Sequence, residues 1–276
     1  MIRPPGTSER PDQPLAVVIG TGALGSAIAR RLGTDHRLLL ADRDGERAAA
    51  FAATLRDEGH DARAITCDIT DLRQVEDVAS AAAGWRTLAH VAALSPSMAD
   101  FRTILAVNLV GTLNVEAAFR PTANAGSAAI FISSLGAHGA PPADEVLALF
   151  DEGLGPDLPA RLEALTPEPD TRRAYQLSKM AMNRMCRRQA GAWGERGARI
   201  LSLSPGLITT PMGALEFKGT PEKMELYLRT PLRREGTMLE IAETLAFLAS
   251  PAASFISGTD ILVDGGLAAA NMFRPK

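Results

Sequence analysis

The sequence is poor in cysteine and has no strong excess of charge of either sign, and each shortage excludes a class of protein. The two cysteines among 276 residues, Cys67 and Cys186, stand far apart and in no metal-ligand spacing. They cannot build a disulfide framework, so we predict two buried thiols. The formal net charge is −3, with no basic block. This balance gives no electrostatic footprint for a nucleic-acid partner.

Long apolar runs and ligand-spaced histidines are also missing. No stretch reaches the roughly 18 apolar residues of a membrane span, and the polar, proline-rich residues 1–14 lack the apolar core of a signal peptide. We expect a cytoplasmic protein that has no membrane partner and begins with a flexible arm at 1–14. The histidines show no metal-ligand spacing, so we predict no metal site: His36, His60, His90 and His138.

Short apolar runs alternate with longer amphipathic ones from Leu15 onward. This alternation is typical of β-α-β units, and a hydrophobic content of 46% is enough for a large core. We predict an α/β fold: a doubly wound, mainly parallel, seven-stranded Rossmann-type sheet with helices on both faces, in one domain over 15–276. The predicted strands cover residues 15–20, 37–42, 61–67, 86–92, 127–133, 198–204 and 260–263.

One segment breaks this rhythm. Residues 140–172 open with Ala-Pro-Pro-Ala, close with Thr-Pro-Glu-Pro-Asp, and contain two short helical patterns. We predict that they form an insertion that caps the edge of the sheet.

Three glycines follow the first predicted strand at the mouth of a helix. Gly20, Gly22 and Gly25 have the spacing G-x-G-x-x-G. In this context the first permits a tight turn, the second lets the backbone approach a pyrophosphate, and the third allows the helix to pack on the strand. We expect the helix start, with Ala23 and Leu24, to bind the phosphates of a dinucleotide. The alternative is that the glycines only form a turn.

Two carboxylates end the second and third predicted strands. Asp42 can accept hydrogen bonds from the adenosine ribose and repel a 2′-phosphate, which favours NAD over NADP. Alternatively, Asp42 belongs to a solvated turn, and Arg43 reaches a 2′-phosphate. Asp68 and Ile69 are expected to meet the adenine, unless Asp68 only caps the next helix.

Tyrosine and lysine are scarce, with two and four residues, yet Tyr175 stands four places before Lys179 in a predicted helix. Positions i and i+4 share a helix face, so an ammonium beside the phenol is expected to lower the pKa of Tyr175. Such a phenol is a general acid or base near neutral pH. The alternative is a solvated surface pair.

With these motifs in order, the chain resembles the short-chain dehydrogenase/reductase superfamily from about Leu15 to Leu267. Within the superfamily it looks most like the 3α-hydroxysteroid dehydrogenase/carbonyl reductase branch. Further matching motifs are Asn108 in Val-Asn-Leu-Val-Gly, Ser133-Ser134 after the fifth strand, Pro205-Gly206 after the sixth, and Val263-Asp264-Gly265-Gly266.

The resemblance implies a role for each candidate catalytic residue. Tyr175 would exchange the alcohol proton, and Lys179 would lower the phenol pKa and bind the nicotinamide ribose. Ser134, rather than its rival Ser133, would polarise the substrate oxygen. Asn108 would hold a water linked to Lys179, or alternatively face polar backbone. Contacts to the NAD cofactor are expected from Ala92, Tyr175, Lys179, Pro205, Gly206 and Ile208.

The chain also departs from the family pattern. The family glycine motif T-G-x-x-x-G-x-G is replaced by the ordinary dinucleotide spacing. The family's N-N-A-G after strand four reads His90-Val91-Ala92-Ala93, and Ala93 restricts a backbone that glycine leaves free. The insertion also separates Ser134 from Tyr175 by 41 positions.

We expect residues 206–232 to form a substrate loop. Its apolar side chains and those of the insertion suit a hydrophobic cyclic alcohol or ketone, such as a hydroxysteroid, although such residues are equally typical of core or subunit contacts. We therefore expect an NAD-dependent oxidoreductase that assembles as a homodimer, or alternatively a homotetramer. The alternatives are an epimerase or dehydratase of related fold, or an NAD-binding sensor without catalysis. The apolar candidates are Leu147, Leu149, Phe150, Leu207, Ile208, Met212, Leu215, Phe217, Met224 and Tyr227.

Overall fold

A seven-stranded parallel sheet forms the centre of the molecule. The computed structural model describes residues 12–155, 157–210 and 221–273. The strand order is β3-β2-β1-β4-β5-β6-β9, with every pairing parallel. The predicted fold class and all seven strands are confirmed. The strands are β1 (Leu15–Ile19), β2 (Arg37–Asp42), β3 (Ala62–Thr66), β4 (Trp85–His90), β5 (Ala128–Ile132), β6 (Arg199–Pro205) and β9 (Asp260–Val263).

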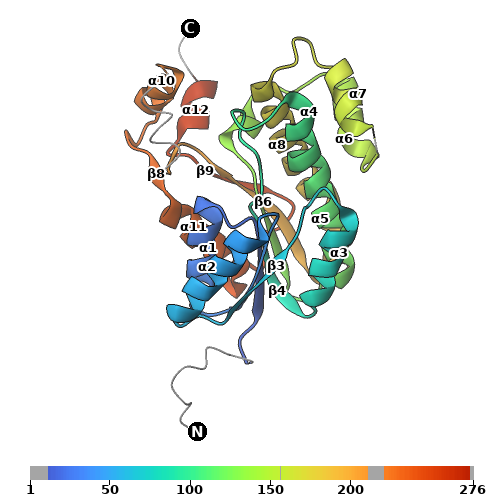
Figure 1. Ribbon diagram of the computed structural model, residues 1–276. Helices are drawn as coiled ribbons and strands as arrows, with labels where there is room; N and C mark the ends of the chain where they lie inside the picture. Colours follow the sequence, from blue (N-terminus) through green and yellow to red (C-terminus); the bar gives the residue numbers. More distant parts are fainter. Residues whose placement is uncertain (1–11, 156, 211–220, 274–276) are drawn as a thin grey trace.

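Helices cover both faces of this sheet (Figure 1). Each face has its own apolar core, to which β1, β4, β5 and β6 contribute alternate residues because successive side chains of a strand point to opposite faces. One face is covered by α1 (Ala23–Leu32), α2 (Gly45–Asp57) and α11 (Met238–Ala249). The other is covered by α3 (Leu72–Ala81), α5 (Gly111–Phe119) and α8 (Thr171–Gly194).

Polar caps set the starts of several helices. Asp44, Asp71 and Asp170 accept hydrogen bonds from backbone N–H groups in the first turns of α2, α3 and α8. Asp100 does the same for α4 (Phe101–Leu105), which runs through a π-helical turn at Ala106–Val110 into α5. Thr237 and Glu240 form a reciprocal capping box at the start of α11. Each cap satisfies donors that have no partner inside the helix, and so fixes where the helix begins.

The predicted insertion forms two helices, α6 (Asp144–Glu152) and α7 (Leu158–Ala164). The prediction that it caps the sheet edge is wrong. The helices pack on α8 and α4, outside the helical layer (Figure 1). Their apolar residues join a third core with those of α4 and α8, and this burial explains the position: Phe101, Ile104, Leu105, Leu109, Val146, Leu149, Phe150, Leu158, Leu162, Ala174, Leu177 and Ala181.

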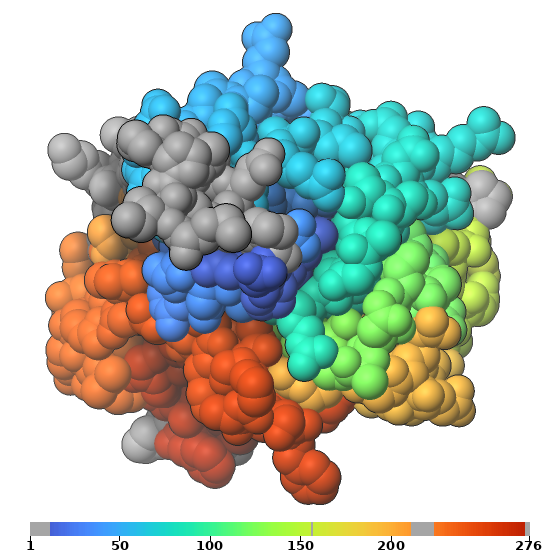
Figure 2. Space-filling view, turned by 90° about the horizontal axis from the view of Figure 1, so that it is seen from below, coloured from blue at the N-terminus to red at the C-terminus, as the bar shows by residue number. Residues whose placement is uncertain are grey.

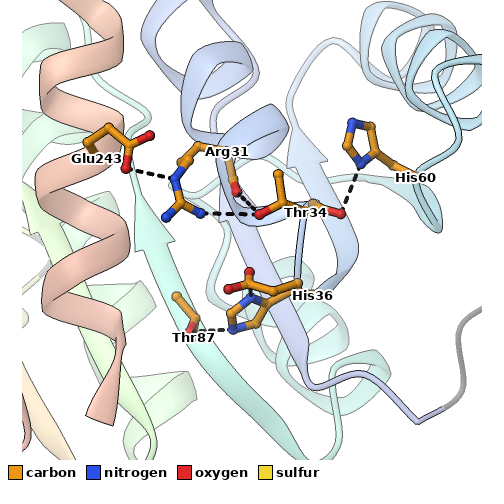
Figure 3. A network of polar contacts seen from close by, with 8 residues as sticks. Arg31, Thr34, His36, His60, Thr87 and Glu243 are labelled. Carbon is orange, nitrogen blue, oxygen red and sulfur yellow. Dashed lines mark hydrogen bonds and ion pairs between the residues drawn. The ribbon is translucent and has the colours of Figure 1, made fainter. Parts of the chain in front are cut away.

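Polar contacts hold the turn between α1 and β2 at the amino ends of the strands. Arg31 bonds to Glu243 of α11 and to Thr34, and His36 lies 3.3 Å from Thr87 of β4 (Figure 3). Seen from this end, the α11 segment lies beside the α1 segment (Figure 2). The predicted site residues Gly20 and Ser134 follow the opposite, carboxyl ends of β1 and β5.

The remaining described elements are short. None of the described helices is long and apolar enough to cross a membrane. The predicted arm at 1–14 lies almost wholly outside the described residues, as do positions 211–220 of the predicted substrate loop. The short elements are the 3₁₀ turns Arg120–Thr122, Leu135–His138 and Pro251–Ala253, the strands β7 (Ile208–Thr209) and β8 (Gly236–Thr237), and helices α10 (Pro221–Arg229) and α12 (Leu267–Met272).

The third core predicts a contrast between two leucines of the insertion. Leu162 is fully buried, whereas Leu165 is 43% exposed. We expect Leu162→Ala to lower the free energy of unfolding by about 2–5 kcal/mol, because it leaves a cavity. Leu165→Ala should change it by only about 0.5 kcal/mol. Urea unfolding followed by circular dichroism measures both; equal effects would contradict the packing described.

Candidate active site

The glycine loop, residues 20–25, follows β1 and contacts Ala92 in the segment after β4. The strand order of the sheet reverses between β1 and β4. Gly20 has φ = +97°, and a Cβ added there would lie 2.5 Å from the backbone nitrogen of Ala92. A Cβ at Gly25 would lie 1.9 Å from the Gly20 carbonyl oxygen. Both positions therefore require glycine. Ligands of open α/β sheets bind at this reversal of strand order.

The start of α1 is open above this loop. Ser26 N–H is bonded to the Gly22 carbonyl, but the N–H groups before it precede the first intrahelical bond. Gly22 and Ala23 are exposed, Leu24 is partly exposed, and a Cβ at Gly22 would meet no atom within 4 Å. Free N–H groups and space for a close approach fit the pyrophosphate of a dinucleotide.

Asp42 connects the glycine loop to the end of β2. Its Oδ2 accepts bonds from Thr21 N–H and Oγ1 at 2.7 and 2.8 Å. Its Oδ1 accepts from Asp44 N–H at 3.0 Å and from Arg47 at 2.8 Å. Burial alone would raise the pKa of Asp42, but the bonds from Thr21 and Asp44 and the charge of Arg47 bring it below its usual value.

The sequence reasoning missed two partners of this carboxylate. Thr21 lies between the first two glycines, and Arg47 lies in the first turn of α2. Arg47, not Arg43, forms the ion pair. A hydroxyl within the glycine motif was the available signal for Thr21, but no sequence pattern distinguishes Arg47 from Arg43.

Asp68 takes part in local turn structure. Its Oδ1 accepts from the N–H and hydroxyl of Thr70 at 2.9 and 2.8 Å, while Asp71 caps α3. The Ile69 carbonyl accepts from Asn114 Nδ2 at 2.9 Å. The alternative that Asp68 caps the next helix is wrong, because Asp71 is the cap of α3. The adenine contacts of Asp68 and Ile69 stay a prediction.

Ser134, Tyr175 and Lys179 meet at the carboxyl end of β5. Tyr175 and Lys179 share one face of α8, with the Lys179 nitrogen 5.7 Å from the centre of the Tyr175 ring. The Ser134 side chain is near enough to Tyr175 to lower the pKa of the phenol. A Cβ at Gly136 would lie 3.6 Å from both Ser134 Oγ and Tyr175 Cε1. The 41 residues between Ser134 and Tyr175 therefore do not separate them in space.

The two adjacent serines point to different partners. Ser133 is buried and donates to the Lys179 carbonyl at 3.3 Å, whereas Ser134 is partly exposed and accepts from Gly136 N–H at 3.1 Å. This geometry favours Ser134 as the residue that can meet a substrate.

Burial shifts the pKa values of both Tyr175 and Lys179. Burial raises the pKa of Tyr175, and the Ser134 side chain offsets only part of this effect. Lys179 is buried and donates to the Ile132 carbonyl at 2.8 Å, and burial lowers its pKa to about 7. Burial and Ser134 account for the shift in the pKa of Tyr175, and the lowering of the phenol pKa by a charged Lys179 stays a prediction.

Asn108 lies in the π-helical turn and is fully buried. Its Oδ1 accepts from Leu94 N–H at 2.7 Å, and its Nδ2 donates to the Leu94 carbonyl at 2.9 Å. The side chain thus faces polar backbone, as the alternative proposed, and fixes the segment after β4. Water binding by Asn108 stays a prediction.

The segments after β6 and β9 approach each other closely. Gly206 N–H donates to Val263 at 2.9 Å, and a Cβ at Gly206 would lie 2.6 Å from Asp264 Cα. This contact orders Pro205 and Gly206 before Ile208 in β7. Asp264 caps the backbone of Gly266 and Ala268. The cofactor contacts of Pro205, Gly206 and Ile208 stay predictions.

The structure also locates the predicted cysteines and several of the apolar substrate candidates. Both cysteines are buried, as predicted, and burial raises the pKa of Cys67 to about 12. Among the described residues, no three His, Cys, Asp or Glu side chains are grouped as a metal site. Leu149 and Phe150 belong to the third core, so the core alternative holds for them. Three of the loop candidates lie outside the described residues: Met212, Leu215 and Phe217.

Two family models match the chain. The one described as short chain dehydrogenase matches residues 14–144, and the one described as enoyl-(acyl carrier protein) reductase matches residues 162–268. The short-chain dehydrogenase/reductase bsc3 of Alternaria brassicicola is 34% identical over 263 residues, which cover 92% of this chain and 95% of that protein. The chain belongs to the short-chain dehydrogenase/reductase family.

Other similar members of the family carry different substrates in their names. Galactitol 2-dehydrogenase (L-tagatose-forming) of Cereibacter sphaeroides is 31% identical, over 93% of this chain and 96% of its own. A 3α-hydroxysteroid dehydrogenase/carbonyl reductase of Comamonas testosteroni is 30% identical, over 82% and 93%. The steroid branch is thus one relative among several. The crystal structure of gox2181, at 22% identity, a TM-score of 0.76 and coverage of 94% and 97%, shows the same fold.

The short-chain dehydrogenase/reductase family uses nicotinamide cofactors. Substitutions at two glycines distinguish an effect on cofactor binding from an effect on folding. We expect Gly22→Ala to leave the melting temperature unchanged, because its Cβ meets no atom, yet to weaken NADH binding at least about tenfold by obstructing the phosphates. Gly25→Ala should lower the melting temperature, because its Cβ would overlap the Gly20 carbonyl. NADH fluorescence and thermal unfolding measure the two effects. Unchanged NADH affinity in Gly22→Ala would contradict the phosphate site.

Proposed function

We propose that the protein interconverts a secondary alcohol and a ketone with NAD(H), on a hydrophobic cyclic substrate such as a hydroxysteroid or related carbonyl compound. The observation that carries this proposal is the convergence of Ser134, Tyr175 and Lys179 at the carboxyl end of β5, on the same edge of the sheet as the glycine loop. The presence of all three side chains argues against a sensor that has lost catalysis.

We propose a separate role for each of the three side chains. Ser134 and Tyr175 both border Gly136, and we infer that one substrate oxygen can contact both hydroxyls. Because the pKa of Tyr175 lies above its usual value, its resting form is the phenol, which can donate a proton to a ketone oxygen. In the oxidative direction the phenol must first lose its proton, and a charged Lys179 favours that loss. A bound nicotinamide would supply or accept the hydride.

The preference for NAD is supported by the buried carboxylate of Asp42. Its negative charge at the end of β2 opposes a 2′-phosphate. All four bonds that it accepts come from within the chain, so ribose hydroxyls must replace one of them. Arg47 is the replaceable partner, since its side chain is 55% exposed.

The hydrophobic substrate is supported by the apolar residues of the loop and of the helix after it. Leu207 and Ile208 precede the undescribed stretch, and Met224 follows it, 47% exposed. The galactitol relative shows that polyols are the class to test against. We propose a homodimer because α6 and α7 already cover α4 and part of α8. The cytoplasmic location stays a prediction.

Three substitutions test the catalytic assignment. We expect Tyr175→Phe and Ser134→Ala to lower kcat by about 10²–10⁴-fold, since each removes a group that contacts the reacting oxygen. Ser133→Ala is the matched control and should cost less than about tenfold, since its hydroxyl serves the helix backbone. NADH absorbance is followed with hydroxysteroids, terpene alcohols and polyols. Equal loss in both serine variants would reject the role of Ser134; turnover of polyols alone would reject the substrate class.

A single carboxylate decides the cofactor in this proposal. We expect Asp42→Ser to raise the kcat/KM ratio of NADP to NAD at least about tenfold, because a repelling charge is removed and Arg47 is released. Asp44→Ser removes an equal charge two positions away and retains a helix cap, so it should change the ratio little. Wild-type preference for NADP would refute the proposal.

A further inference from the structure

His90 is a buried imidazole that the proposed function leaves without a role. It ends β4, has no exposed surface, and packs edge-to-face on Phe131 with ring centres 5.4 Å apart. Its Nε2 lies 3.0 Å from Thr112 Oγ1. Within the described part of the chain, its buried Nδ1 has no hydrogen-bond partner. An unpaired buried polar atom is rare enough in proteins to need a reason.

The neighbours of His90 decide which nitrogen carries the proton. Thr112 Oγ1 lies 2.7 Å from the Asn108 carbonyl oxygen. That oxygen has no proton, so the single hydroxyl proton of Thr112 must point to it. Thr112 therefore accepts from His90 Nε2–H, and Nδ1 is left as a bare acceptor. Burial, then the charge of Lys179, lowers the pKa of His90 to about 3, so the ring is neutral near pH 7.

Lys179 has hydrogen-bond donors without partners, whereas His90 has an acceptor without one. Its ammonium carries three N–H groups, and the structure gives it one bond, to the Ile132 carbonyl. Ile132 follows Phe131, which pairs with His90 across β4 and β5. The ammonium and the imidazole therefore lie at the ends of neighbouring strands, beneath α5 and α8. No direct hydrogen bond joins them.

We propose that His90 is a positioning residue for Lys179: its Nδ1 accepts a hydrogen bond from one bound water, which in turn accepts one from the Lys179 ammonium. This inference rests on the proposed function only for its catalytic meaning. The water link stabilises the charged form of a lysine that burial otherwise drives toward the neutral amine. It leaves the opposite side of the ammonium available to the site.

Few other groups can produce this effect. Among the residues that the structure describes, Tyr175 from its own helix and His90 from β4 are the titratable groups that interact with Lys179. No carboxylate among them contributes to the shift in the pKa of Lys179. The polar groups of the π-helical turn, α5 and the segment after β5 are not titratable: Asn108, Thr112, Ser133 and Ser134.

Two amide substitutions distinguish the roles of the two ring nitrogens of His90. The Oδ1 of asparagine falls at the place of Nδ1, whereas the longer glutamine reaches the place of Nε2. His90→Asn therefore keeps the acceptor for the water, and His90→Gln keeps the contact with Thr112 alone. Circular dichroism verifies that both variants fold.

The measurement is the titration of Lys179 by carbon-13 NMR of lysine-labelled protein. The chain has only four lysines, and Lys179→Met identifies the signal. We expect His90→Asn to titrate within about 0.3 pH units of wild type and His90→Gln about one unit lower, because losing an acceptor destabilises the ammonium. Nitrogen-15 NMR of wild-type histidines should show His90 protonated at Nε2 and neutral at pH 5.

Identical titration of Lys179 in all three proteins would overturn the proposal, and so would an equal shift in both variants, which would reflect loss of the ring alone. If neither variant folds, the wild-type histidine spectrum decides, since a proton on Nδ1 refutes the link. None of these measurements needs turnover. Failure of the proposed oxidoreductase activity would therefore leave this result intact.

Discussion

The burial of the Lys179 ammonium is the constraint on which the site depends. Its bond to the Ile132 carbonyl, and the bond from Ser133 Oγ to the Lys179 carbonyl, fasten the middle of α8 to the end of β5 from both directions. Tyr175 lies one turn earlier and is therefore held beside Ser134. The same burial that fixes the geometry also weakens the charge, since removing an ammonium from water favours the neutral amine. Position and protonation state are thus set by one packing arrangement.

Much of the fold was predictable because its signals are local. Parallel strands buried on both faces appear in the sequence as short apolar runs. The turn after β1 requires glycine at position 20, because a Cβ there would overlap the Ala92 backbone. The insertion was recognised by its prolines and helical patterns, but its position was not. Its apolar stripe has no local preference between a sheet edge and the outer faces of α4 and α8.

The site was predictable in its residues and less so in its electrostatics. A spacing of four places Lys179 on the same helix face as Tyr175, but the long lysine side chain extends past the ring to a strand carbonyl. No spacing rule contains that third partner. Arg47 and His90 were missed for a similar reason. Their importance comes from bonds to Asp42 and Thr112, which lie on other segments.

The insertion buries a second side of α8. One side of α8 packs on the sheet, and its stripe of Ala174, Leu177 and Ala181 packs in the third core with α6 and α7. On a helix with solvent on that side these positions could be polar, but here they are buried against the insertion. A substitution in this stripe of α8 therefore also changes the packing of a segment that belongs to neither the sheet nor the glycine loop.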